Sequence, residues 1–133
     1  MFSYFTVNDA NEALPTVIEK FKALQMQKQE VQKLEAQLST QLTASGNLVD
    51  YVKMKQQLNT SVTKFYEAVE DLEKTGVVLK SLDEGLLDFP SKRFEEEVWL
   101  CWKEGEKEIK FWHEKDVGFM GRKPLSVSDE SLV

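Results

Sequence analysis

The residues best suited to chemistry gather in one stretch of the sequence, between Val98 and Leu125. This stretch holds all three tryptophans, the single cysteine, Cys101, and the single histidine, His113. Binding sites combine aromatic walls with a few polar groups, so a site is to be sought here. The wall candidates are Trp102, Phe111, Trp112 and Phe119. No complete catalytic motif accompanies them, so no catalytic residue is assigned and the protein is not expected to be an enzyme.

His113 is the candidate metal ligand, because imidazole is the commonest metal-binding side chain. Cys101 is its natural soft partner for zinc or copper. A hairpin loop of two or four residues within 104–107 would send these two side chains to opposite faces of a sheet, so we expect them not to share an ion. The sequence favours a structural histidine at the sheet end over a ligand to a transition metal or haem iron, or a catalytic base. Cys101 is expected to be a buried small hydrophobe rather than a nucleophile.

A second candidate site lies in residues 118–123, where backbone N–H groups and two cations could bind a phosphate or carboxylate. The segment lacks the strand, glycine loop and helix order of a phosphate-binding motif. We favour a turn in which Arg122 pairs with an acid such as Asp88 or Asp116. The cofactor is left unknown, with none as the first expectation and a transition metal or haem as the alternative.

Helices must position this stretch. Thr6 and Asp9 form a variant of the capping box, which predicts a short helix over about 7–14. Pro15 disfavours helical geometry in the residue before it and suits the first turn of a new helix, which we expect to run over 15–42.

A reversal is predicted at 44–47, followed by a second long helix over 48–74 that ends at Gly76. Apolar residues recur at three- and four-residue steps along both helices, as in a coiled coil. The stripes are Val17, Phe21, Leu24, Val31, Leu34, Leu38 and Leu42, and then Leu48, Tyr51, Leu58, Val62, Phe65, Val69 and Leu72. Two such helices joined by a short turn predict an antiparallel hairpin.

Strands are predicted over 77–79, 86–89, 97–102 and 108–113, with Pro90 either stopping the second strand or marking an edge. Alternation places Val98, Leu100, Trp102, Ile109, Phe111 and His113 on the face that we assign to the helices. Trp99, Cys101, Lys110 and Trp112 fall on the other face, which we expect to be partly exposed, with Lys110 lying over Trp99.

These elements predict an α+β fold, in which a short N-terminal helix and a long antiparallel helical hairpin pack on a small antiparallel β-meander. Residues 1–125 are expected to form a single domain, with the hairpin at about 15–74, the β part at about 76–125 and a flexible tail at 126–133. The net charge of −6 has no basic patch, which argues against nucleic-acid binding. We expect no membrane span and no secretory signal, and therefore a cytoplasmic location.

Several short motifs resemble those of a known family. They are Phe5-Thr6, Ala10-Asn11 and Leu14-Pro15; Gly85-Leu86-Leu87-Asp88-Phe89-Pro90; Leu100-Cys101-Trp102 with Gly105-Glu106; and Phe111-Trp112-His113 followed by Gly118-Phe119, Gly121-Arg122 and Pro124-Leu125. On these motifs the chain resembles the prokaryotic domain-of-unknown-function family 2203, over nearly its whole length and most specifically over 100–125. The resemblance implies a stand-alone cytoplasmic protein with no established activity. Lys107 stands where a proline is expected in many members, which leaves the loop type open.

The function that the sequence favours is a non-enzymatic interaction or scaffold protein that self-associates through its helical hairpin. A homodimer is the expected form, because stripes of this length need more apolar cover than one small sheet supplies. Any further protein partner is unknown. The alternative is a small metal- or haem-binding protein with His113 as ligand.

Overall fold

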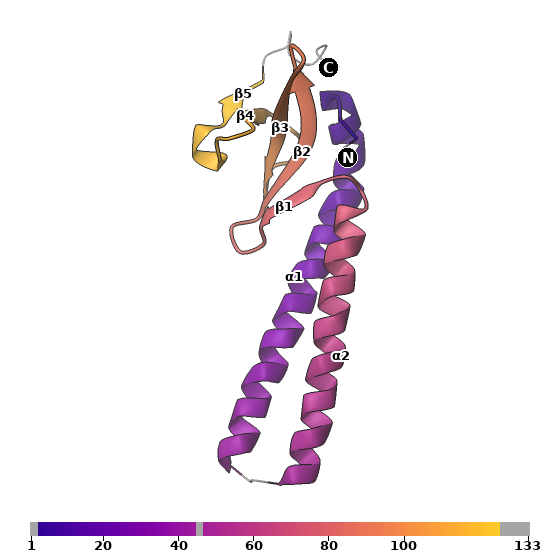
Figure 1. The fold of residues 1–133 in the computed structure, drawn as a ribbon, viewed down its shortest axis with the longest axis vertical. Helices are drawn as coiled ribbons and strands as arrows, with labels where there is room; N and C mark the ends of the chain where they lie inside the picture. Colours follow the sequence, from indigo (N-terminus) through magenta and orange to yellow (C-terminus); the bar gives the residue numbers. More distant parts are fainter. Residues whose placement is uncertain (1–2, 45–46, 126–133) are drawn as a thin grey trace. The chain divides into compact units, whose positions relative to one another are not determined.

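Two long helices precede five short strands in the computed structural model, which describes residues 3–44 and 47–125 (Figure 1). The elements are α1 (Val7–Ala44), α2 (Leu48–Glu73), β1 (Val78–Ser81), β2 (Leu86–Arg93), β3 (Glu96–Lys103), β4 (Phe111–Glu114), the 3-10 turn η1 (Phe119–Gly121) and β5 (Lys123–Pro124). The strands form one antiparallel sheet in the order β1-β2-β3-β4-β5. The predicted α+β class, with a helical hairpin and a β-meander, is confirmed.

The chain divides into two compact units, one from the described parts of 1–18 and 72–133 and the other from Glu19–Asp71. The first contains the sheet and the second contains most of the hairpin. The predictions that 1–125 form a single domain and that the hairpin packs on the sheet stay predictions. The predicted flexible tail, 126–133, lies outside the described residues.

The N-terminal helix is continuous through Pro15, so the predicted break between two helices is wrong. Its start is as expected, since Thr6 Oγ1 accepts from the Asp9 amide at 2.9 Å. Pro15 lacks the amide hydrogen that would bond the carbonyl four residues earlier. The helix continues because Leu14 and Val17, on either side of the proline, are both fully buried in the core.

In the hairpin unit, buried apolar side chains and an ion pair connect the two helices. Phe21, Leu24 and Leu58 are buried, and Lys20 on α1 bonds Asp71 on α2 at 2.7 Å. Most predicted stripe positions are buried or half-buried, but Leu48 is exposed, against expectation. Its place in the first turn of α2, directly after the reversal, explains the exposure. The side chain of Leu42 lies outside the described ones.

The second strand is longer than predicted because it continues through Pro90. β1 pairs only with Leu86, Leu87 and Asp88, so the backbone edge at Pro90 is free of β1 and the missing amide costs no ladder bond. The Pro90 carbonyl on that edge accepts from the Phe5 amide at 2.8 Å. The prediction that Pro90 marks an edge is therefore confirmed, and the prediction that it stops the strand is wrong.

A two-residue turn joins β2 to β3, a hairpin that the sequence did not predict. Arg93 pairs with Glu96, and the two residues between them, Phe94 and Glu95, have φ angles of 51° and 68°. Such turns favour Asn-Gly because both central residues need positive φ. The usual sequence signal is absent here, which is why this hairpin was missed.

The register of β3 on β4 differs from the predicted one. Trp99 pairs with His113 and Cys101 pairs with Phe111, so an odd number of residues separates the paired positions. The longer connection is stabilised by Glu106, whose carboxylate accepts from the Lys103 amide at 2.7 Å and whose carbonyl accepts from Trp102 Nε1 at 2.9 Å. An odd separation reverses the predicted face of every β4 side chain.

Buried side chains lie on both faces of the sheet at β3. Val98, Leu100 and Trp102 are buried on the face assigned to the helices, as expected. The opposite face was expected to be partly exposed, yet Trp99 and Cys101 on it are only 7% and 1% exposed. This second buried face is where polar side chains meet.

Candidate metal centre

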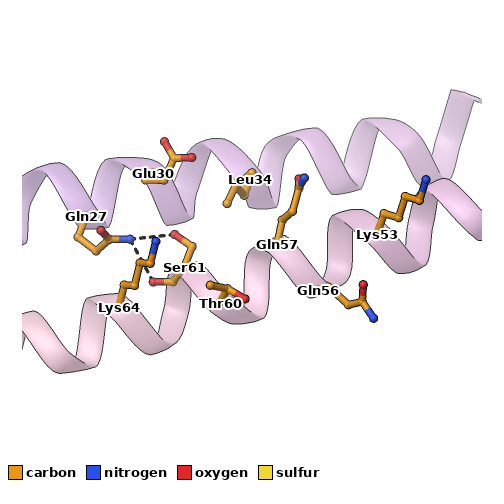
Figure 2. A pocket seen from close by; sticks show the side chains of 9 residues that line it. All are labelled: Gln27, Glu30, Leu34, Lys53, Gln56, Gln57, Thr60, Ser61 and Lys64. Carbon is orange, nitrogen blue, oxygen red and sulfur yellow. Dashed lines mark hydrogen bonds between the residues drawn. The ribbon is translucent and has the colours of Figure 1, made fainter.

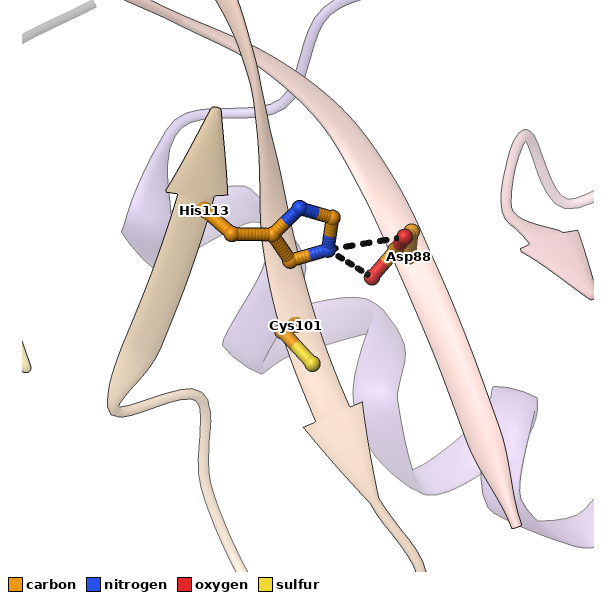
Figure 3. A group of neighbouring side chains, drawn as sticks. All are labelled: Asp88, Cys101 and His113. Carbon is orange, nitrogen blue, oxygen red and sulfur yellow. Dashed lines mark hydrogen bonds and ion pairs between the residues drawn. The ribbon is translucent and has the colours of Figure 1, made fainter. Parts of the chain in front are cut away.

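Three side chains of metal-ligating type meet on the second face of the sheet. Asp88 on β2, Cys101 on β3 and His113 on β4 lie side by side on adjacent strands, with the His113 ring reaching Asp88 and Cys101 next to them (Figure 3). One carboxylate oxygen, the sulfur and one ring nitrogen lie within 4.8 Å of one another, and all three residues are buried. The prediction that Cys101 and His113 lie on opposite faces is therefore wrong. The odd-length connection between β3 and β4 is the physical reason.

The imidazole of His113 is held at both nitrogens. Nδ1 lies 2.9 Å from the Glu114 carbonyl oxygen, and because a carbonyl only accepts, Nδ1 carries a proton and donates it. Nε2 lies 3.1 and 3.0 Å from the two carboxylate oxygens of Asp88. The bond at Nδ1 thus fixes the ring so that Nε2 faces the cluster, which is the arrangement of a metal-binding histidine.

Asp88 is a buried carboxyl beside two cationic or potentially cationic groups. Burial raises its pKa above the ordinary value, while His113 and then Lys80 act in the opposite direction. Lys80 Nζ lies 3.9 Å from Asp88 Oδ2 and 4.3 Å from the centre of the Trp99 ring. The predicted cation–π partner of Trp99 was Lys110; Lys110 instead lies 3.5 Å from Glu108.

Cys101 is the least polar member of the cluster. Burial, followed by the nearby charge of Asp88, raises the pKa of its thiol to about 11, and Arg122 opposes this rise. The side chain is a protonated thiol at neutral pH, which agrees with the expectation of a buried small hydrophobe and argues against a free thiolate nucleophile. A bound cation would reverse this, because a coordinating thiol loses its proton.

A small cavity of about 110 Å³ opens next to the three side chains. Its apolar walls include Trp99, Leu86 and Phe119, and Lys80 and Lys115 are also at its edge. The segment from Lys115 to Phe119 lines the cavity together with the strand residues. Phe119 is half-buried here.

The cluster residues lie within the part of the sequence that a known family shares. A family model described as an uncharacterized conserved protein, DUF2203, matches residues 3–125. The chain belongs to this family. The comparisons with curated proteins and with solved structures found no match. The family inferred from the sequence motifs is thus confirmed, and its prokaryotic origin stays a prediction.

In this DUF2203 member the predicted anion or ion-pair site is arranged differently from expectation. Arg122 pairs with Glu106, with Nη2 2.9 Å from Oε2, and not with Asp88 or Asp116. The guanidinium stacks 3.9 Å from the Phe111 ring centre and 4.4 Å from that of Phe119. Arg122 therefore links the segment after β4 to the loop between β3 and β4. Asp88 belongs to the cluster, and Asp116 is exposed.

The predicted aromatic wall is divided between the two faces. Phe111 shares the face of His113, and Phe119 lines the cavity. Trp102 and Trp112 project from the opposite face, where Trp102 belongs to the core and Arg93 lies 4.5 Å from the Trp112 ring centre. Trp99, which the sequence placed away from His113, is the tryptophan of the site.

Close packing holds the segment that borders the cavity. A Cβ at Gly121 would lie 2.0 Å from Val117 Cγ1, so only glycine fits there without movement. Trp99 Nε1 donates to the Lys115 carbonyl at 3.4 Å.

A broader groove of about 720 Å³ lies between the two helices of the hairpin unit (Figure 2). Its one buried polar residue, Ser61, accepts from Gln27 Nε2 at its hydroxyl and carbonyl oxygens, at 3.0 and 3.2 Å. The other walls are mainly exposed Lys, Gln and Glu side chains. Neither histidine nor cysteine is among the described residues that line it, so the cluster on the sheet is the stronger candidate site.

No helix among residues 3–44 and 47–125 has the length and apolarity that crossing a bilayer requires.

Proposed function

We propose that this protein binds a transition-metal ion, with Zn²⁺ as the first choice, through Asp88, Cys101 and His113. The observation that supports this is the convergence of three ligand-type side chains within 4.8 Å, all of them buried, from three adjacent strands. A thiolate and an imidazole select zinc or copper over magnesium and calcium, which prefer oxygen ligands. A reducing cytoplasmic setting suits an unpaired cysteine in this role.

The simpler interpretation is a structural histidine paired with a buried acid. It accounts for the contact between His113 and Asp88, and it treats Cys101 as the buried small hydrophobe described above. It also leaves a buried polar pair, which is commonly no better for stability than an apolar replacement. Metal binding accounts for all three residues and for the outer hydrogen bond from Nδ1 to Glu114. The spacing of 3.0 Å between Nε2 and Oδ2 is that of a hydrogen bond, and it would widen to about 3.4 Å if both atoms bound one tetrahedral Zn²⁺. A cavity of about 110 Å³ favours a single ion over haem as the ligand of this site.

Zinc titration of the purified, chelator-treated protein tests the proposal. We expect one Zn²⁺ per chain by equilibrium dialysis, and a rise in Tm that corresponds to about 2.7 kcal/mol at a free concentration 100 times Kd. Cys101→Ala should lose most of this rise. Ser91→Ala is the matched control. Ser91 is a buried polar residue of β2, like Asp88, but its hydroxyl donates to the Phe5 carbonyl and not to the cluster. A wild-type Tm that zinc, copper and cobalt leave unchanged would contradict the proposal.

Self-association through the hairpin is a second candidate function. α1 and α2 leave Val31, Val62 and Phe65 only half-buried, around a groove of about 270 Å³, and Tyr66 beside them is 64% exposed. A second copy presents the same surface, so an isologous homodimer would cover it.

Sedimentation analysis tests the homodimer. We expect the wild type to be dimeric at micromolar concentration and Tyr66→Lys to be monomeric, with Tyr4→Lys, an exposed tyrosine of the other unit, as the control. A monomeric wild type would contradict self-association, and it would leave the metal proposal untouched.

A further inference from the structure

The metal site has three protein donors, whereas zinc in proteins is usually bound by four ligands. Among the acids, cysteine and histidine of residues 3–44 and 47–125, only Asp88, Cys101 and His113 form a cluster of this kind. The rest of the cavity is lined by Lys80, Leu86, Trp99, Lys115, Val117, Gly118 and Phe119. None of these side chains is a usual zinc ligand, so the described lining of the cavity leaves the fourth position to a ligand from solution. Three protein ligands plus an exchangeable position is the arrangement of catalytic zinc sites rather than structural ones.

The charges around the cavity favour an anion in that position. Zn²⁺ bound by one carboxylate and one thiolate has no net charge. Lys80 then adds one positive charge, 3.9 Å from Asp88 Oδ2. Lys115, at the same cavity, is already paired with Glu97 Oε2 at 2.7 Å and adds little. A single negative charge therefore completes the balance.

The size of the cavity limits this anion. A volume of about 110 Å³ holds several waters, because one water needs only about 10–15 Å³ of space measured in this way. Apolar surfaces of Trp99, Leu86 and Phe119 line it, so a short apolar group on the ligand is tolerated. Formate and acetate are small enough for this space, whereas benzoate is much bulkier and is expected to bind more weakly.

We propose that the fourth coordination position of the Asp88–Cys101–His113 site is open and binds a small monoanion of the size of formate or acetate, with Lys80 as its second contact. This inference rests on the proposed metal binding. It assigns a ligand class to the site: a small carboxylate, which replaces a metal-bound water and places its remaining atoms against Trp99 and Phe119.

Cobalt substitution of the full chain separates the two proposals. Co²⁺ bound to Cys101 gives a thiolate-to-cobalt charge-transfer band, which reports metal binding alone. The visible d–d bands report the coordination sphere, so titration with sodium acetate at constant ionic strength should shift them with saturation, while benzoate should do so only at higher concentration. Lys80→Met should retain the charge-transfer band and bind acetate at least about tenfold more weakly, because one close positive charge is lost. Lys107→Met, an exposed lysine of the hairpin loop, is the control and should match the wild type.

The outcomes are distinct. A charge-transfer band with d–d bands that acetate does not alter would show that metal binds but the fourth position is closed, which overturns this inference alone. Equal acetate affinity in Lys80→Met and the wild type would overturn the role of Lys80. The absence of a charge-transfer band at saturating cobalt would overturn both the metal proposal and this inference.

Discussion

Replacing His113 by alanine is expected to lower the free energy of unfolding by about 3–5 kcal/mol at neutral pH in the metal-free protein, because the change removes one partner of a buried pair. His113 is 3% exposed and Asp88 is 2% exposed, so water cannot replace the lost contact at little cost. The variant leaves the buried Asp88 carboxyl without the hydrogen bonds at 3.0 and 3.1 Å, and with Lys80, 3.9 Å from Oδ2, as its remaining charged neighbour.

The pH dependence of this loss has a definite sign. Burial already raises the folded-state pKa of Asp88 above 3.8, and His113 is the first of the groups that oppose the rise. Without His113 the folded-state pKa rises further. A carboxyl with a raised folded-state pKa contributes stability that is fully present below its unfolded-state pKa and is lost as pH rises through the folded-state value. The difference between wild type and His113→Ala should therefore be small near pH 4 and grow as pH increases toward neutrality.

Urea unfolding at several pH values measures this difference directly. The control is the double variant Asp88→Leu/His113→Leu, in which no charge remains to be buried. We expect it to recover part of the lost stability and to remove the added pH dependence, because apolar replacement of a buried pair is often neutral or favourable. A loss in His113→Ala that stays constant with pH would mean that its cause is the cavity alone and not the stranded carboxyl.

The fold was largely predictable from sequence because its signals are local. Hydrophobic periodicity gives both helices, the capping pair at Thr6 gives the start of α1, and Gly76, with a φ of 101°, ends α2. The predicted helix break at Pro15 was wrong because local propensity favours a break there, whereas burial of the residues on both sides of the proline maintains one helix. Tertiary packing outweighs propensity at such a position.

The site was less predictable because it depends on the register between strands that lie far apart in the sequence. Whether the connection between two strands has an odd or an even number of residues decides the sheet face on which the side chains of the second strand lie. The connection after Lys103 is held by hydrogen bonds to Glu106, which hydrophobic periodicity does not reveal. Asp88 was considered only as a partner for Arg122. Its position within the apolar run from Leu86 to Phe89 was the available signal, since an acid in a buried strand needs a buried partner.

Cys101 gives the second large effect, at alkaline pH. The folded-state pKa of its thiol is about 11, compared with an ordinary value of 9.0. Its contribution to stability is therefore complete below pH 9 and is lost as pH rises to 11. At about 1.4 kcal/mol for each unit of pKa difference, the metal-free wild type should lose about 2–3 kcal/mol in this range relative to Cys101→Ala.

The comparison between wild type and Cys101→Ala isolates the thiol, because other groups that titrate at alkaline pH contribute equally to both proteins. Tyr4 is one of them, since its hydrogen bond to Glu97 raises its pKa. Unfolding by urea at pH 8, 9, 10 and 11 gives the two stability curves. Parallel curves would show that the thiol ionises as easily in the folded protein as in the unfolded chain, and that Cys101 is not desolvated.

Zinc should reverse this alkaline behaviour if Cys101 is a ligand. A coordinated sulfur is already a thiolate at neutral pH, so no thiol remains to ionise between pH 9 and 11. With zinc bound, the wild type should therefore show no loss of stability between pH 9 and 11 relative to metal-free Cys101→Ala. Wild-type protein with zinc that still loses about 2–3 kcal/mol would show that the ion, if bound, is held without the sulfur. The same pair of curves thus tests both the burial of the thiol and its service as a ligand.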